Sequence, residues 1–237
     1  MDYNNNTSVT LPIGIFVFIL LTNCAGAATW IVDPTPGVGD YITIQDAINE
    51  STAGDTIQVQ SGTYYEHVVV NKQLTLQGTD TGSGLPVIDG NASGSAIALS
   101  ANNCTLQDFV AMSSGQSGII VASSYNTVLG NTATGSGYGI VLSSSSNGNT
   151  ISGNTATGNT NYGIYLTSST GNTISGNIAN GSDTGISISG SSGNTISNNT
   201  ANSNDIGIEL PSSSGNTISG NIATNNIHYG ISLSHSS

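Results

Sequence analysis

The side chains best suited to chemistry recur at one offset from a repeated Gly-Ile dipeptide. Two positions before the six copies of this dipeptide lie Gln116, Gly137, Asn161, Asp183, Asp205 and His228. If successive copies stack as strands about 4.8 Å apart, Asp183 and Asp205 form a carboxylate pair, with Asn161 on one side and His228 on the other. Glu209, which directly follows a Gly-Ile dipeptide, adds a third carboxylate.

These carboxylates suggest two kinds of chemistry. Asp183 and Asp205 could hold Ca²⁺ through their oxygens. Together with Glu209 they could also divide as acid and base on a glycosidic bond. A simpler explanation is structural, because Asn and Asp ahead of a glycine favour turns by bonding their own backbone. The sequence favours the structural explanation and keeps calcium binding and catalysis as alternatives.

Aromatic side chains occupy the position just before three of the same dipeptides. Tyr138, Tyr162 and Tyr229 could line one ridge and stack against sugar rings, with Asn161 and His228 beside them as polar ligand-binding residues. Packing over the adjoining turn would explain the three tyrosines equally well.

The charge balance excludes some function classes. A single cation, Lys72, faces thirteen acidic side chains, for a formal net charge of −12. Nucleic-acid binding is excluded, because phosphate contacts require cations. Uronate-cleaving chemistry is disfavoured, since it needs a cationic base or clamp. No cofactor is required, and copper is not expected because its usual ligand types lie on separate segments: His67, Cys104, Met112, His228 and His235.

The elements that must position these residues are short strands in a repeat. The hexapeptide Asn-Thr-Ile-Ser-Gly-Asn begins at Asn149, Asn172 and Asn216, with variants beginning at Asn126 and Asn194. Consecutive starts are 22 or 23 residues apart, and the Gly-Ile dipeptides keep nearly the same period. Each copy contains two or three β-type segments separated by Gly, Ser and Asn. This pattern predicts one coil of parallel strands per copy.

The predicted fold class is therefore all-β, a single-stranded parallel β-helix. Stacking predicts three inward columns: Ile140, Ile164, Ile186, Ile208 and Ile231; Leu142, Leu166, Ile188, Leu210 and Leu233; Ile151, Ile174, Ile196 and Ile218. The residues that alternate with the first two columns should face outward: Val141, Tyr165, Ser187, Glu209 and Ser232. A ladder of side-chain amides is expected at Asn131, Asn154, Asn177, Asn199 and Asn221.

The chain divides into three regions. Residues 1–27 are predicted to be a signal peptide, because an apolar run from Leu11 to Leu21 precedes small residues. The alternative is an uncleaved anchor, since no Lys or Arg precedes the run; after cleavage no membrane span would remain. Residues 28–56 form an N-terminal segment with a capping helix, in which Thr43 is the N-cap. Residues 57–237 form the β-helix, regular from about residue 96, with a missing or minimal C-terminal cap that could allow end-to-end self-association.

The N-terminal motifs and the repeats carry a family resemblance. The segments 41–48, 53–57, 62–64 and 74–78 resemble the opening of right-handed parallel β-helix proteins of the pectin-lyase-like superfamily. The two repeated motifs are similar to NosD-like, or CASH (carbohydrate-binding and sugar hydrolysis), repeats. The resemblance covers about residues 30–237. It implies an exported β-helix associated with surface polysaccharide or, as in the name-giving member, with copper delivery to a reductase. Its motifs are core and turn residues, so they specify fold rather than activity.

We therefore expect an extracytoplasmic protein that is secreted, periplasmic or at the cell surface. The favoured function is a non-catalytic module that binds polysaccharide or a surface protein along its long face. One alternative is an enzyme acting on neutral polysaccharide through Asp183, Asp205 and Glu209. A second alternative is a NosD-like accessory protein in copper-enzyme maturation.

Overall fold

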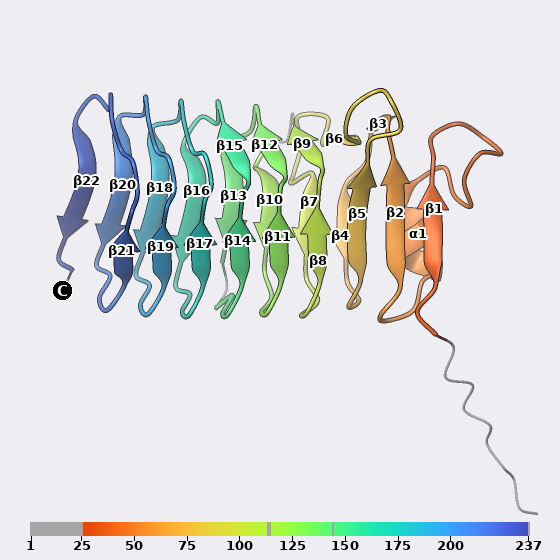
Figure 1. Ribbon diagram of the computed structural model, residues 1–237, viewed down its shortest axis with the longest axis horizontal. Coiled ribbons are helices and arrows are strands. Elements are labelled where there is room, and N and C mark those ends of the chain that lie inside the picture. Colours follow the sequence, from red (N-terminus) through yellow and green to blue (C-terminus); the bar gives the residue numbers. More distant parts are fainter. Residues whose placement is uncertain (1–25, 113–114, 144, 237) are drawn as a thin grey trace, which may run out of the picture.

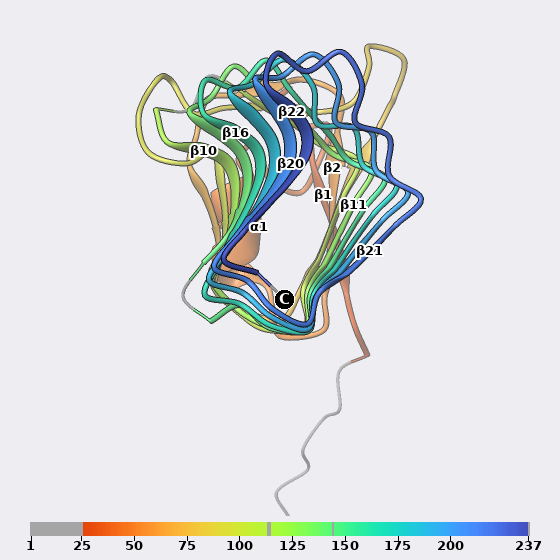
Figure 2. The same cartoon turned by 90° about the vertical axis from the view of Figure 1, so that its left-hand side faces the viewer.

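The computed structural model describes residues 26–112, 115–143 and 145–236, which form a right-handed parallel β-helix of about nine turns (Figure 1). The predicted signal peptide lies almost entirely outside the described residues. Viewed along the stack, the coils enclose a single core (Figure 2). The predicted fold class and coil length are confirmed.

Three parallel sheets line the coils. Sheet A contains β1 (Thr29–Val32), β2 (Thr56–Gln60), β5 (Thr75–Thr79), β8 (Thr105–Gln107), β11 (Thr127–Leu129), β14 (Thr150–Ser152), β17 (Thr173–Ser175), β19 (Thr195–Ser197) and β21 (Thr217–Ser219). Sheet B contains β3 (Thr63–Tyr64), β6 (Val87–Asp89), β9 (Val110–Met112), β12 (Thr132–Thr134) and β15 (Thr155–Thr157). Sheet C contains β4 (Val68–Val70), β7 (Ile97–Leu99), β10 (Ser117–Val121), β13 (Tyr138–Leu142), β16 (Tyr162–Thr167), β18 (Thr184–Ser189), β20 (Ile206–Pro211) and β22 (Tyr229–Ser234).

The predicted aliphatic columns form the core. Ile140, Ile164, Ile186 and Ile208 pair in register between neighbouring strands of sheet C and are fully buried. Each follows a glycine because the coils approach closely there: a Cβ on Gly185 would lie 2.6 Å from the carbonyl oxygen of Gly207. The Gly-Ile dipeptide is thus explained by packing alone.

Buried amide ladders connect the coils at the turns. Asn154 donates from its backbone N–H and from Nδ2 to Oδ1 of Asn177, at 2.9 and 3.0 Å, and Asn177 does the same to Asn199. This confirms the predicted ladder from Asn131 to Asn221. A second ladder, which the sequence analysis did not predict, runs through the first asparagine of each hexapeptide: Asn126, Asn149, Asn172, Asn194 and Asn216.

The N-terminal end of the core is covered by α1 (Ile44–Glu50), as predicted. Thr43 Oγ1 accepts the N–H of Asp46, and the apolar side of the helix is buried. Lys72 Nζ donates to three carbonyls at the other end of the helix, those of Ile48, Asn49 and Ser51. The one lysine therefore has a structural role. Strand β1 lies within residues 28–56, the predicted N-terminal segment, and pairs in parallel with β2. Sheet A therefore begins inside this segment.

The last coil corrects part of the predicted core. Ile231 and Leu233 keep their register with Ile208 and Leu210, but they are 46% and 61% exposed. Ile218 is only partly buried. Among the described residues no further coil covers these side chains, so register alone did not bury them.

Candidate functional site

Backbone hydrogen bonds join neighbouring coils at the column two positions before each Gly-Ile dipeptide. Asn161 N–H donates to Gly137 O at 2.8 Å, Asp205 N–H to Asp183 O at 3.0 Å, and His228 N–H to Asp205 O at 2.8 Å. These bonds place Asp183 and Asp205 on neighbouring coils at the start of β18 and β20. Asp183 and His228 are exposed and Asp205 is half-buried. Calcium binding by the two aspartates stays a prediction.

A cluster of three tyrosines covers part of the outer face of sheet C. Tyr138 pairs in register with Tyr162, and their rings stack with centroids 5.6 Å apart at 14°. Tyr165 stacks on Tyr162 at 4.8 Å and lies 6.0 Å from Tyr138. We call Tyr138, Tyr162 and Tyr165 the tyrosine cluster. All three are half-buried, so part of each ring faces solvent.

The cluster differs from the predicted ridge in its third member. Tyr229 holds the same register position as Tyr138 and Tyr162, but Thr184 and Ile206 occupy that position on the two intervening coils. Tyr229 is therefore separated from Tyr162 by about 14 Å along the stack. Tyr165 was expected to face outward but was given no role. The contact between Tyr165 and Tyr162 depends on the orientation of the two rings, which the spacing of the residues does not specify.

Two hollows adjoin the tyrosine cluster and share Tyr138. The first, of about 280 Å³, lies over the strand starts and is lined by Tyr138, Asn161, Tyr162, Asp183 and Thr184. The second, of about 340 Å³, is lined by seven residues: Gln116, Ser117, Tyr138, Val141, Ser143, Tyr165 and Thr167. The structure thus brings Asn161 and Asp183 together with two of the three predicted tyrosines, whereas His228 and Tyr229 line neither hollow.

Acidic groups dominate the electrostatics of this face. Burial raises the pKa of the Tyr162 phenol, and the negative charge of Glu209, the neighbouring tyrosines and Asp183 raise it further. Glu209 Oε1 accepts a hydrogen bond from Ser187 Oγ at 2.8 Å on the adjacent coil. Lys72 Nζ is held by the carbonyls at the end of α1. A phenol surrounded in this way stays protonated and remains a hydrogen-bond donor.

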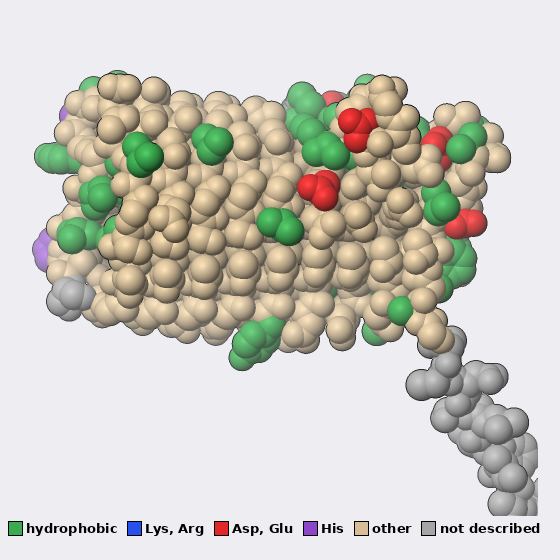
Figure 3. All heavy atoms as spheres, viewed as in Figure 1, with side chains coloured by type: hydrophobic (Ala, Val, Ile, Leu, Met, Phe, Trp, Pro, Cys, Tyr) green, Lys and Arg blue, Asp and Glu red, His purple; other side chains and the backbone are tan. Residues whose placement is uncertain are grey.

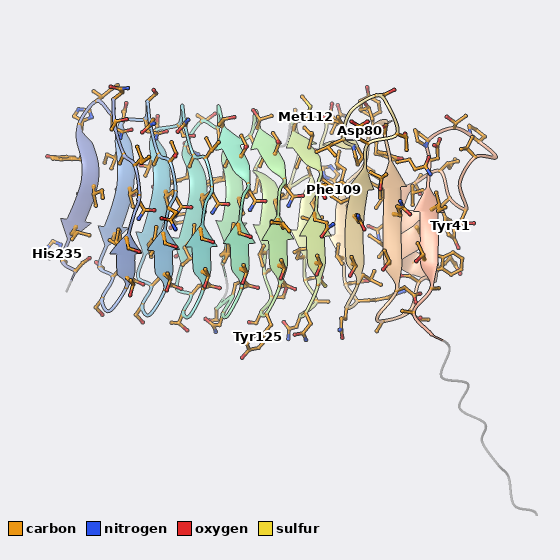
Figure 4. The ribbon with its side chains drawn as sticks, viewed as in Figure 1. Tyr41, Asp80, Phe109, Met112, Tyr125 and His235 are labelled. Atoms are coloured by element: carbon orange, nitrogen blue, oxygen red, sulfur yellow. The ribbon has the colours of Figure 1, made fainter. Side chains whose placement is uncertain are left out.

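The possible copper ligands named from the sequence are not grouped in the part of the chain that the structure describes. Within residues 26–112, 115–143 and 145–236, no three His, Cys, Asp or Glu side chains are grouped so as to hold an ion. His67 is hydrogen-bonded through its two ring nitrogens to Ser95 O and Ser93 Oγ. The thiol of Cys104 is buried, which raises its pKa, and donates to backbone carbonyls. Met112 and His235 lie far apart along the stack (Figure 4).

The coils, the amide ladders and the side-chain-lined outer face of sheet C define a right-handed parallel β-helix protein. The model of the NosD family, described as periplasmic copper-binding protein, matches residues 46–237. The chain therefore belongs to the NosD family. No curated protein sequence matches it.

Solved structures with the same fold share little sequence with this chain. Pectate lyase Pel9A has a TM-score of 0.59 at 16% identity, covering 90% of this chain and 77% of its own. An alginate lyase from Paenibacillus sp. str. FPU-7 has a TM-score of 0.58 at 12% identity, covering 88% and 99%. The periplasmic alginate epimerase AlgG has a TM-score of 0.58 at 14% identity, covering 80% and 52%. The chain thus spans about half the length of the epimerase, and these likenesses establish the fold alone.

No helix among the described residues has the length and apolar character needed to cross a membrane.

Proposed function

We propose that this protein is an extracytoplasmic module that binds a polysaccharide on the outer face of sheet C without cleaving it. The observation that carries the proposal is the tyrosine cluster beside two hollows. The faces of sugar rings present C–H groups, which pack well against aromatic rings that remain partly exposed. The family description as periplasmic supports the location.

The polar side chains beside the cluster suit the hydroxyls of a sugar. Asn161 offers both a donor and an acceptor, Thr184 offers a hydroxyl, and Asp183 offers carboxylate acceptors. A few such groups around an apolar surface are the usual composition of a small-ligand site. The solved structures of similar fold are named for alginate, pectate and pectin. This pattern supports a saccharide ligand for the present chain.

The test is binding to a glycan array and then to the selected glycan in solution by calorimetry. Tyr138→Ala and Tyr162→Ala should each weaken binding at least tenfold, about 1.4 kcal/mol. Tyr125→Ala is the matched control: this tyrosine is 66% exposed on the lower edge of the stack (Figure 4) and lines neither hollow. Equal losses from all three variants, or no glycan binding by the wild type, would refute the proposal.

A second candidate function is hydrolysis of a neutral polysaccharide. It is favoured by one observation, the position of Asp183 in the wall of the first hollow. A carboxylate there would reach a bound sugar, and Asp205 follows on the next coil. Turnover of the selected glycan that disappears in Asp183→Asn would establish this activity. Binding without turnover by the wild type would leave the module as the function.

A further inference from the structure

We infer that the two hollows beside Tyr138 are two subsites of one groove, which accepts a neutral glycan of at least two sugar residues running obliquely across the coils. This inference rests on the proposed function and adds the direction, the length and the charge of the ligand.

The direction follows from the strands that line each hollow. The first hollow lies at the starts of β13, β16 and β18, where Tyr138, Tyr162 and Thr184 are paired in register. The second lies over β10, β13 and β16, from Gln116 and Ser117 at the start of β10 to the strand ends at Ser143 and Thr167. From Tyr138 to Ser143 the chain advances about 16 Å. A ligand in both hollows therefore crosses the coils obliquely as it follows the strands.

The shared tyrosine sets the minimum length. Tyr138 belongs to both linings, so its ring separates the two hollows and contacts a ligand on either side. Each hollow is close to about 300 Å³, the lower end of the usual range for small-ligand sites. Each therefore has room for a short piece of glycan, and two adjacent sugar residues are needed to occupy both.

The charge of the ligand follows from the carboxylates. Asp183 lines the first hollow, and the charge of Glu209 acts on Tyr162. Lys72, the only lysine and the chain's sole cation apart from histidine, is held at α1 by three carbonyls. An acidic sugar would meet like charge with no compensating cation. A neutral sugar can instead donate hydroxyl protons to Asp183 and to Oδ1 of Asn161.

The two subsites differ in polarity, which orients the ligand. Asn161, Asp183 and Thr184 surround the first hollow, whereas the surface of the second is mostly apolar, with Val141 and the rings of Tyr138 and Tyr165 beside the polar residues Gln116, Ser117, Ser143 and Thr167. The sugar with more free hydroxyls belongs in the first hollow. The sugar that presents a C–H face belongs over Tyr165, because an apolar wall cannot satisfy buried hydroxyls.

The experiment compares neutral and acidic oligosaccharides on the full chain. The probes are neutral gluco-, manno- and N-acetylglucosamine oligosaccharides of one to four residues, and oligogalacturonates of the same lengths, measured by calorimetry. We expect at least a tenfold gain in affinity from one to two residues for the best neutral series, and at least tenfold weaker binding of the galacturonate of equal length. Tyr165→Ala should remove the gain in affinity from the second residue.

Asp183→Asn separates charge from shape. This variant should reduce the ratio of the affinities for neutral and acidic oligosaccharides at least threefold. Glu50→Gln, which changes an exposed carboxylate on α1, should leave that ratio unchanged. Circular dichroism and thermal unfolding establish that each variant folds. If no glycan of either class binds, the proposed function fails. If neutral glycans bind but galacturonates bind equally well, or if a second residue adds nothing, the function stands and this inference is overturned.

Discussion

The outer faces of sheets A and C share one core and one period, yet their side chains differ in kind. On sheet A, all nine strands present an in-register threonine: Thr29, Thr56, Thr75, Thr105, Thr127, Thr150, Thr173, Thr195 and Thr217. This face is largely uncharged (Figure 3). On sheet C the corresponding column changes from coil to coil: Val141, Tyr165, Ser187, Glu209 and Ser232. Val141 and Ser187, which were expected to face solvent, are buried.

This difference shows that the stacking of coils explains the residues on the outer face of sheet A but not those on the outer face of sheet C. A β-branched threonine favours the strand conformation and packs against the threonines of the neighbouring strands in the same way on every coil. Nothing in the stack requires Tyr165 on one coil and Glu209 two coils later. The variable face also contains the tyrosine cluster and both hollows beside it. We therefore expect the two faces to respond alike when the core is changed and differently when the surface is changed.

The largest effect should come from the shared core. Ile174 lies behind sheet A and Ile186 behind sheet C, and both are fully buried. Ile174→Ala and Ile186→Ala should each lower the free energy of unfolding by about 2–5 kcal/mol, because each leaves a cavity. Urea unfolding followed by circular dichroism measures both. If one substitution lowers the free energy of unfolding by less than half as much as the other, the core contributes unequally to stability behind the two sheets.

A smaller loss is expected at the amide ladder. Asn177→Ala removes the Oδ1 that accepts two donors of Asn154, and the Nδ2 that donates to Ile151 O and to Asn199. Buried donors left unpaired should cost about 1–3 kcal/mol. Ser175→Ala, on the outer face of sheet A two residues earlier, should stay within about 0.5 kcal/mol. Equal costs for the two variants would show that the ladder does not stabilise the stack.

The third effect is a loss of stability that occurs only at low pH. It concerns Asp55, a carboxylate at the N-terminal end of sheet A. Asp55 accepts the N–H groups of Thr52 and Ala28, and then Nε1 of Trp30, and these bonds lower its pKa from 3.8 to about 2. The carboxylate therefore stabilises the fold above about pH 4, and this contribution is lost as the pH falls towards 2.

Thermal unfolding between pH 5 and pH 2 measures this contribution. The melting temperature of the wild type should fall more steeply over that interval than that of Asp55→Asn, which lacks the ionised group. Parallel curves for the two proteins would show that the hydrogen bonds accepted by the Asp55 carboxylate do not stabilise the fold.

The smallest effects should come from the two surfaces. Thr195→Ala on sheet A should change the free energy of unfolding by no more than about 0.5 kcal/mol. Tyr162→Ala on sheet C should cost slightly more, since a stacked aromatic pair contributes about 0.5–1.5 kcal/mol. If Tyr162→Ala instead proved as costly as Ile174→Ala in chemical unfolding, the tyrosine cluster would be a packing element, as the structural alternative holds.

Most of the fold could be predicted from the sequence, because residues separated by one repeat in the chain are also neighbours in space. The spacing of Ile164, Ile186 and Ile208 is also the spacing of contacting coils, so a pattern in the chain is a column in space. The helix at residues 44–50 was predicted from its cap and its apolar side. The second amide ladder was within reach too, since Asn149 and Asn172 recur with the same period.

The candidate site was less predictable. The sequence singled out Tyr138, Tyr162, Asn161 and Asp183, and the structure places these four around one hollow. It also singled out Tyr229, which two intervening coils separate from Tyr162, and it assigned no role to Tyr165. Ring contacts depend on side-chain rotamers and on the residues of neighbouring coils, which a period does not encode.

The amino-acid sequence by itself determined the coil length, the inward and outward positions and the acidic character of the protein. These features depend on residue type and spacing, and strand geometry converts spacing directly into direction. Only the tertiary structure decided which outward side chains meet, where they leave hollows, and that the aliphatic side chains of the last coil are exposed. Those outcomes depend on which residues of neighbouring coils pack against each side chain, because the burial of a side chain is determined by its surroundings as well as by its type.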